Sequence, residues 1–138
     1  ADTCLRRILN YAEDHFCQHL PIIYAQTVIG ANDRGELVTR GLFVGDRVNE
    51  RIQVFDQNGQ YLAEWPGIMA SGMDITEDDV IYVADYQLRL GIVIANASDF
   101  TEIGFIENAM PEGVTVDRMG NVYAGEVLPR NLKKFVKN

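Results

Sequence analysis

One segment of the sequence, residues 42–65, recurs along the chain and limits the possible folds more than any other feature. It contains two alternating apolar–polar runs, Arg51–Phe55 and Gln60–Trp65, on either side of Asn58-Gly59. An Asn-Gly pair between alternating runs is the strongest short-range signal for a type I′ hairpin, in which both central residues need a positive φ. Because an apolar run also precedes the pair, the segment predicts three antiparallel strands joined by tight turns.

The pattern returns about every 40 residues. An acid ends the second strand of each unit, at Asp46, Asp85 and Glu126, and therefore recurs after 39 and then 41 residues. The triplet at residues 52–54 is matched by another at residues 92–94. A period near 40 residues built from short alternating strands is typical of a β-propeller, in which each repeat forms one four-stranded blade. The sequence thus predicts a mainly β fold of about three blades, a half-propeller.

One complete blade can be placed within residues 71–106. Its four strands are predicted at Gly72–Thr76, Val80–Ala84, Gly91–Ala95 and Thr101–Ile106. The alternative architecture is a compact α+β domain, in which the repeat-like strands form a single curved sheet under a helix.

Residues 1–41 do not follow this repeat. Apolar residues at spacings of three and four predict an amphipathic helix over residues 3–19. A strand rich in β-branched and aromatic residues is predicted at Ile22–Ile29, and the sequence leaves the register of residues 27–41 open. The chain is therefore expected to divide into a helix-and-strand extension, residues 1–41, and a partial propeller, residues 42–138.

The charge of the chain argues against two classes of partner. A formal net charge of −8 over 138 residues repels phosphates, so neither nucleic acid nor an anionic membrane is expected as a partner. The longest apolar run falls far short of the ~20 residues needed to span a bilayer. The first 20 residues carry charges where a signal peptide would have its apolar core, so no signal peptide is predicted, and the compartment stays open.

The three recurring acids have two possible roles. Asp46, Asp85 and Glu126 could converge from neighbouring blades on a divalent cation such as Ca²⁺. Alternatively, each carboxylate accepts backbone N–H bonds in the turn that follows it. Recurrence in every repeat favours the structural role. Arg47 and Arg51 are expected to pair with such an acid, and Trp65, at the end of the first unit, is expected to pack between blades.

Both histidines of the chain lie on the predicted N-terminal helix. His15 and His19 are four residues apart, which is the spacing of helical zinc pairs. The motif lacks the glutamate of H-E-x-x-H, and the sequence indicates no third ligand. A solvated polar face is therefore favoured over a zinc site at these two residues.

Three stretches carry a family resemblance. Residues 46–65 (DRVNERIQVFDQNGQYLAEW), 111–127 (PEGVTVDRMGNVYAGEV) and 132–137 (LKKFVK) resemble NHL repeats. They are most similar to the C-terminal part of bacterial NHL proteins that resemble peptidyl-α-hydroxyglycine amidating lyase. The resemblance covers about residues 42–138 and implies a propeller, and related bacterial proteins are commonly exported. That lyase holds zinc through histidines in its central channel, whereas residues 20–138 contain neither histidine nor cysteine.

Two hypotheses of function follow. The first is a non-catalytic propeller module, without a cofactor, that binds a protein or a small-molecule ligand and associates with itself. The second is a divalent-metal lyase or hydrolase that uses carboxylates alone to hold Ca²⁺ or Zn²⁺.

The resemblance implies six blades, of which this chain supplies about three, and its last blade ends before a fourth strand. A homodimer is therefore expected. The strand predicted at Ile22–Ile29 could supply the missing outer strand, from the same chain or from the partner chain.

Overall fold

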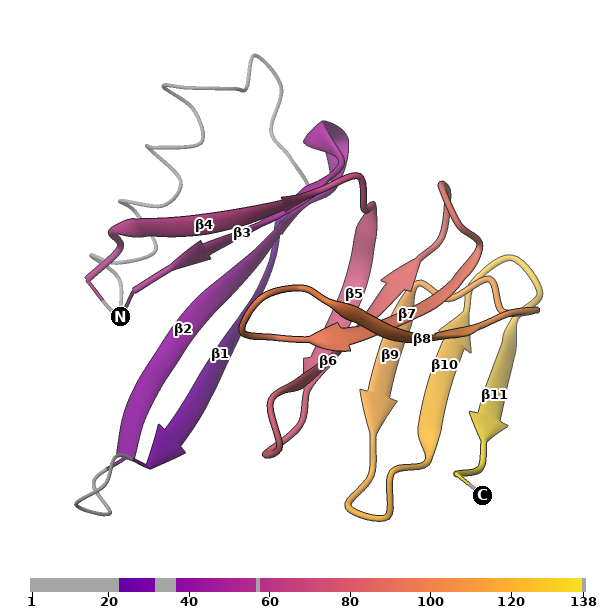
Figure 1. Ribbon diagram of the computed structural model, residues 1–138. Helices are drawn as coiled ribbons and strands as arrows, with labels where there is room; N and C mark the ends of the chain where they lie inside the picture. The colour runs from indigo at the N-terminus through magenta and orange to yellow at the C-terminus, as the bar shows by residue number, and fades with distance from the viewer. Residues whose placement is uncertain (1–22, 32–36, 57, 138) are drawn as a thin grey trace.

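The computed structural model describes residues 23–31, 37–56 and 58–137, with side chains described from Gly41 onward. In this part of the chain, eleven strands form three antiparallel sheets, together with one short 3-10 helix (Figure 1). No helix in the described ranges is long and apolar enough to cross a bilayer. The predicted helix over residues 3–19, with His15 and His19, lies outside the described residues.

In each sheet the strands pair in the order in which they occur in the sequence. The first sheet consists of β1 (Ile23–Ala31), β2 (Leu37–Asp46), β3 (Arg51–Phe55) and β4 (Tyr61–Pro66), with the 3-10 helix η1 (Arg47–Asn49) between β2 and β3. The second consists of β5 (Ala70–Ile75), β6 (Val80–Asp85), β7 (Gly91–Asn96) and β8 (Glu102–Ile106). The third consists of β9 (Gly113–Val116), β10 (Val122–Glu126) and β11 (Asn131–Phe135).

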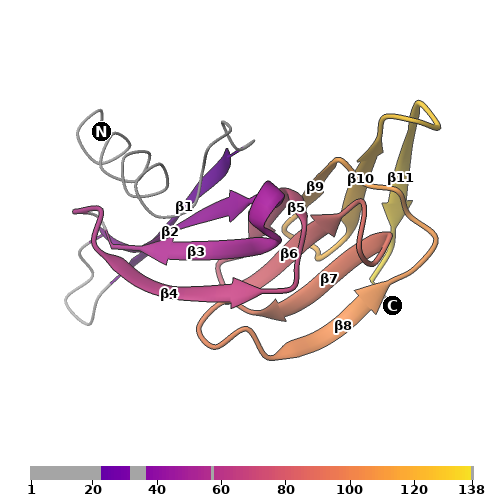
Figure 2. The same cartoon turned by 90° about the horizontal axis from the view of Figure 1, so that it is seen from above.

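The three sheets are consecutive propeller blades. Figure 2 shows them one after another, with the first strand of each sheet on one side and the outer strands β4 and β8 on the other. The inner strand β5 contacts both β1 and β9. The mainly β, three-blade prediction is therefore confirmed, and the strands of the middle blade begin and end within two residues of their predicted bounds. The single curved sheet of the alternative architecture is wrong, because the strands form three separate sheets.

The strand β1 lies within the predicted extension, residues 1–41, and β2 crosses residue 41. It pairs with β2 along its whole length, from Ile23 opposite Asp46 to Ala31 opposite Leu37. It is therefore the innermost strand of the first blade, and it does not serve as the outer strand of the last blade in this chain. The physical reason is proximity, since strands that follow one another through a short connection usually pair. The described part of the predicted extension thus belongs to the propeller.

The β3–β4 turn confirms the hairpin but not its type. Gly59 has a φ of 79°, whereas Asn58 is not among the residues with positive φ. The Asp56 carbonyl accepts the Gly59 N–H at 3.0 Å. The Asp56 side chain accepts the N–H groups of Asn58 and Gln60, both at 2.8 Å. The result is a three-residue loop that closes on a left-handed glycine, so the predicted type I′ turn is wrong.

Apolar side chains between neighbouring blades form the core. One cluster lies between the first and second blades and includes Phe43, Ile52, Met73 and Val83, all buried. Trp65 packs against this cluster and stacks on the Phe100 ring of the second blade, with centroids 5.1 Å apart and planes at 18°. The expectation that Trp65 packs between blades is confirmed. A second cluster, built around Ile92, Val122 and Ala124, joins the second blade to the third.

Candidate functional site

The turns between the second and third strands of the blades lie at one end of the sheets, here called the turn face. Each of these turns follows one of the recurring acids, and all three acids are buried. Each turn also ends on a non-glycine residue with a φ of 53°, which is Glu50, Leu90 or Arg130. The three acids, however, hold their turns in different ways.

Asp85 fulfils the predicted structural role. Its Oδ1 accepts the backbone N–H groups of Gln87, Leu88 and Arg89 in the following turn, at 3.2, 2.8 and 3.3 Å. Its Oδ2 accepts the N–H of Met69, which precedes the inner strand β5, at 3.3 Å. One carboxylate therefore fixes both the turn and the entry of the chain into its blade.

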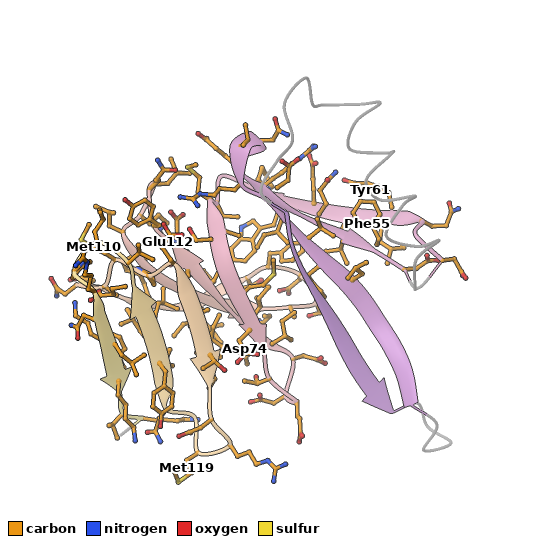
Figure 3. The ribbon with its side chains drawn as sticks, turned by 180° about the vertical axis from the view of Figure 1, so that it is seen from behind. Phe55, Tyr61, Asp74, Met110, Glu112 and Met119 are labelled. Atoms are coloured by element: carbon orange, nitrogen blue, oxygen red, sulfur yellow. The ribbon has the colours of Figure 1, made fainter. Side chains whose placement is uncertain are left out.

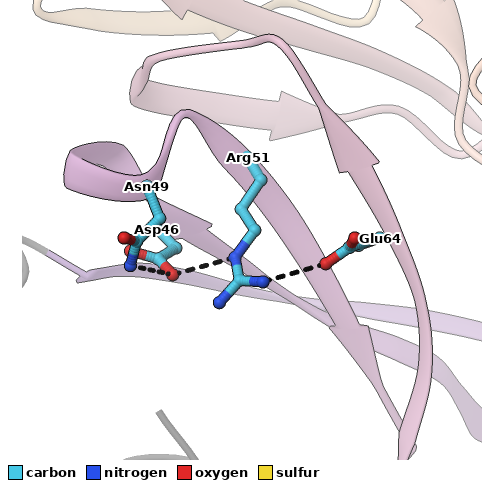
Figure 4. A network of polar contacts seen from close by, with 4 residues as sticks. All are labelled: Asp46, Asn49, Arg51 and Glu64. Atoms are coloured by element: carbon cyan, nitrogen blue, oxygen red, sulfur yellow. Dashed lines mark hydrogen bonds and ion pairs between the residues drawn. The ribbon is translucent and has the colours of Figure 1, made fainter. Parts of the chain in front are cut away.

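Asp46 binds side chains in place of backbone groups (Figure 4). Its two oxygens accept the Asn49 amide at 2.9 and 2.8 Å, and Oδ2 also accepts Arg51 Nε at 3.0 Å. Arg51 Nη1 continues the network to Glu64 on β4 at 3.0 Å. The predicted pairing of Arg51 with a blade acid is confirmed, whereas backbone capping by Asp46 is wrong, since it makes no side-chain cap to η1.

Glu126 is held by one backbone group, one cation and the side chain of Asn131. Its Oε1 accepts the Met110 N–H at 2.7 Å and the Lys133 ammonium at 3.0 Å. The Met110 hydrogen bond, aided by Lys133, holds the pKa of Glu126 below its ordinary value. Pro129 has no N–H to offer, and the predicted bonds from the following turn are not found among the described contacts.

The described residues bring no metal ligands together. No group of three histidine, cysteine, aspartate or glutamate side chains within this part of the chain is placed to hold an ion. Asp46, Asp85 and Glu126 sit in three different blades, and each accepts hydrogen bonds from protein donors. The Ca²⁺ or Zn²⁺ site considered from the sequence thus stays a prediction.

One contact on the turn face joins all three blades. Arg47, directly after the first acid, lies 3.4 Å through Nη1 from Glu112 Oε2, just before the third blade begins. The same guanidinium lies 5.5 Å from the ring centroid of Tyr86, directly after the second acid. Arg47 therefore pairs with Glu112 rather than with a blade acid as predicted. Sequence reasoning missed Tyr86 and Glu112, although the position after each repeated acid was the signal for Tyr86.

The opposite end carries a polar cavity. Figure 3 shows Glu112 and Met110 at one end of the third blade, and Asp74 and Met119 toward the other. A cavity of about 540 Å³ between the second and third blades is lined by Asp74, Tyr82, Asp117 and Lys137 among others. Asp74 accepts the Thr115 hydroxyl at 2.9 Å and the Val116 N–H at 2.8 Å, which ties the two blades together. Asp74 therefore holds the second and third blades together at this cavity.

The third blade exposes a position that the other two bury. Ile52, Ile92 and Leu132 are equivalent, because each is the second residue of its blade's third strand. Ile52 and Ile92 are 0% exposed, whereas Leu132 is 69% exposed. Glycines show the same contrast. A Cβ on Gly72 would lie 3.0 Å from the backbone of the next blade, whereas one on the equivalent Gly113 would meet nothing within 4 Å.

Comparison with known proteins decides the family. No protein-family model matches the chain. Human NHL repeat-containing protein 3 is 32% identical over 110 residues, covering 69% of this chain and 32% of that protein. The chain belongs to the NHL-repeat family. It spans about a third of the length of this curated relative.

A solved structure resembles the NHL chain in fold. A crystal structure of a "Putative exported protein" from Bacteroides fragilis has a TM-score of 0.52 at 17% identity, covering 75% of the NHL chain and 34% of that protein. At this identity the likeness concerns the fold alone. The WD40 repeats of RRP9 reach a TM-score of 0.45 at 16% identity, covering 78% of the chain and 36% of that structure. A TM-score at this level supports no conclusion about the NHL chain. The narrower resemblance to amidating-lyase-like proteins stays a prediction.

Proposed function

We propose that this NHL chain is a non-catalytic propeller module that binds a protein or small-molecule partner through its third blade, and that two copies associate to complete a propeller. The observation that carries the proposal is the exposure of Leu132, at a position fully buried in the other two blades. Exposed apolar side chains on an open blade face favour association, because covering them removes apolar surface from water.

The first blade sets a condition on ring closure. In a closed ring, the first blade of one copy would dock on the third blade of the other. Its docking residues would be Val44 and Phe55, since their equivalents Ala124 and Phe135 pack against the second blade. Val44 and Phe55 are already buried in the single chain. Ring closure must first uncover them, so we expect a dimer that dissociates on dilution.

Sedimentation velocity across the micromolar range tests this association. The unmodified chain is expected to form a dimer that dissociates on dilution, and Leu132→Lys is expected to remain monomeric. Ile103→Lys is the matched control, because Ile103 is an exposed apolar residue on β8 of the second blade. A monomer at every concentration would refute self-association. A dimer unaffected by Leu132→Lys would show that the third blade does not form the dimer contact.

The metal-dependent alternative has less support. A lyase or hydrolase built on carboxylates needs several oxygens free to bind one ion. Asp46 and Asp85 instead use both of their oxygens to accept hydrogen bonds from the protein. Metal analysis of the purified chain separates the two proposals, since an equimolar content of Ca²⁺ or Zn²⁺ would favour the enzyme over the binding module.

A further inference from the structure

The third blade has an open backbone edge. Within the described ranges its sheet contains three strands, and β11 pairs only with β10. The equivalent strands β3 and β7 are each covered on their outer side by a fourth strand, β4 or β8. The outward N–H and C=O groups of β11 thus form a template on which another strand can pair.

In the two complete blades, the fourth strand is also held by an ion pair. Glu64 of β4 accepts Arg51 Nη1 at 3.0 Å. Glu102 of β8 accepts both terminal nitrogens of Arg89, at 2.6 and 3.0 Å. In each case the arginine comes from the start of the third strand or from the turn before it. The two pairs are not at equivalent positions, since Glu64 lies opposite Gln53 and Glu102 opposite Ala95, but each joins a glutamate of the outer strand to an arginine at or before the start of the third strand.

The third blade also has an arginine next to the start of its third strand, although Arg130 stands at the position of Glu50 and Leu90 and not at that of Arg51 or Arg89. Arg130 lies directly before β11, is exposed, and has no ion pair among the described contacts. Leu132 beside it is exposed as well. Residues 127–138 contain four of the twelve lysines and arginines of the chain and no acid, although the whole chain has a net charge of −8. The open edge is therefore locally basic and favours an acidic partner.

We propose that the edge of β11 binds an extended acidic segment of a partner protein, which adds as a fourth strand antiparallel to β11. A carboxylate of that segment pairs with Arg130, and an apolar side chain covers Leu132, as Trp65 and Ile106 lie opposite Ile52 and Ile92. Backbone hydrogen bonds supply the affinity, and the carboxylate supplies the preference for acidic segments. This inference rests on the proposed binding function and names the class of partner.

A peptide from the chain itself provides the probe. A fluorescein-labelled peptide with the sequence of residues 99–106 (DFTEIGFI) contains β8 and its glutamate. Fluorescence anisotropy is expected to show saturable binding to the full chain. The same peptide with Glu102→Lys is expected to bind roughly three- to tenfold more weakly, because an exposed ion pair becomes a repulsion. A shuffled peptide of the same composition is expected not to bind.

A charge exchange tests the contact with Arg130. Arg130→Glu in the chain is expected to weaken binding of the unmodified peptide and to restore binding of the Glu102→Lys peptide. Arg118→Glu is the matched control, because Arg118 is an exposed cation in the β9–β10 turn at the far end of the same blade. It is expected to bind both peptides as the unmodified chain does. Circular dichroism of both variants verifies that they fold.

The outcomes separate this inference from the proposed function. Absence of saturable binding, equal binding of the shuffled peptide, or failure of the charge exchange would overturn the inference. None of these results would contradict self-association measured by sedimentation. Conversely, specific peptide binding by a chain that stays monomeric would support the inference and would remove only the proposed dimer.

Discussion

Replacement of Asp85 tests how a repeated acid stabilises its blade. Leucine has nearly the same branched outline as aspartate but accepts no hydrogen bond, so Asp85→Leu leaves four backbone N–H groups without their acceptor. Asparagine keeps one oxygen for the turn, while its NH₂ group faces the N–H of Met69. The two substitutions therefore remove different parts of one hydrogen-bonding arrangement.

The lengths of the four hydrogen bonds to Asp85 determine the expected loss in the free energy of unfolding. One of the four bonds to Asp85 is short, at 2.8 Å, and the other three are 3.2 to 3.3 Å long. An unsatisfied buried donor costs about 1–3 kcal/mol, and long bonds contribute less than short ones. Asp85→Leu is therefore expected to lower the free energy of unfolding by about 2–3 kcal/mol, and Asp85→Asn by about 1 kcal/mol or less.

Urea unfolding followed by Trp65 fluorescence measures this difference. A loss of 2 kcal/mol lowers the urea midpoint by roughly 1 M for a domain of this size. Asp99→Leu is the control, because Asp99 accepts the Thr101 N–H in an exposed turn, and the midpoint is expected to change less. Equal and negligible effects of Asp85→Leu and Asp85→Asn would show that this carboxylate does not stabilise the blade.

Three further perturbations test other contacts. Hydrogen bonds, that of the Asn121 side chain first among them and those of Tyr123 and Met119 after it, lower the pKa of Asp117 from 3.8 to about 2. This carboxylate therefore stabilises the fold above about pH 4 and loses its effect as the pH falls through about 2. In Asn121→Ala, an NMR titration should find a higher pKa for Asp117, and acid unfolding should begin at a higher pH. A double-mutant cycle of Trp65→Ala and Phe100→Ala should give a coupling energy of about 0.5–1.5 kcal/mol in urea unfolding. Arg51→Met should cost about 3–5 kcal/mol by the same assay, because it leaves a buried carboxylate without its cation.

The sequence predicted the blades well because their signal is repeated. The 40-residue period and the alternating strands placed the middle blade within two residues of its observed bounds. The turn chemistry was less predictable. Asn58-Gly59 suits both a two-residue and a three-residue hairpin, and hydrogen bonds from the Asp56 side chain favour the longer loop. Left-handed Glu50 and Leu90 carry no local sequence signal, since such residues rarely adopt a positive φ.

The candidate site was only partly predictable, because its contacts cross between blades. The buried acids were found from their recurrence, yet equal sequence positions do not imply equal partners. Asp46 has Asn49 and Arg51 within reach, and Glu126 has Lys133. Arg47 meets Glu112 from 65 residues away, and no spacing rule predicts such a pair.

Amide hydrogen exchange of the dilute chain tests the central claim most directly, which is that the third blade repeats the second but has an open outer edge. β7 pairs with β6 on one side and β8 on the other, so its paired amides on both sides should be protected. β11 pairs only with β10, so its inward amides should be protected and its outward amides should exchange rapidly. Protection along all of β11 equal to that of β7 would contradict the open edge, and rapid exchange throughout β11 would contradict the third blade itself.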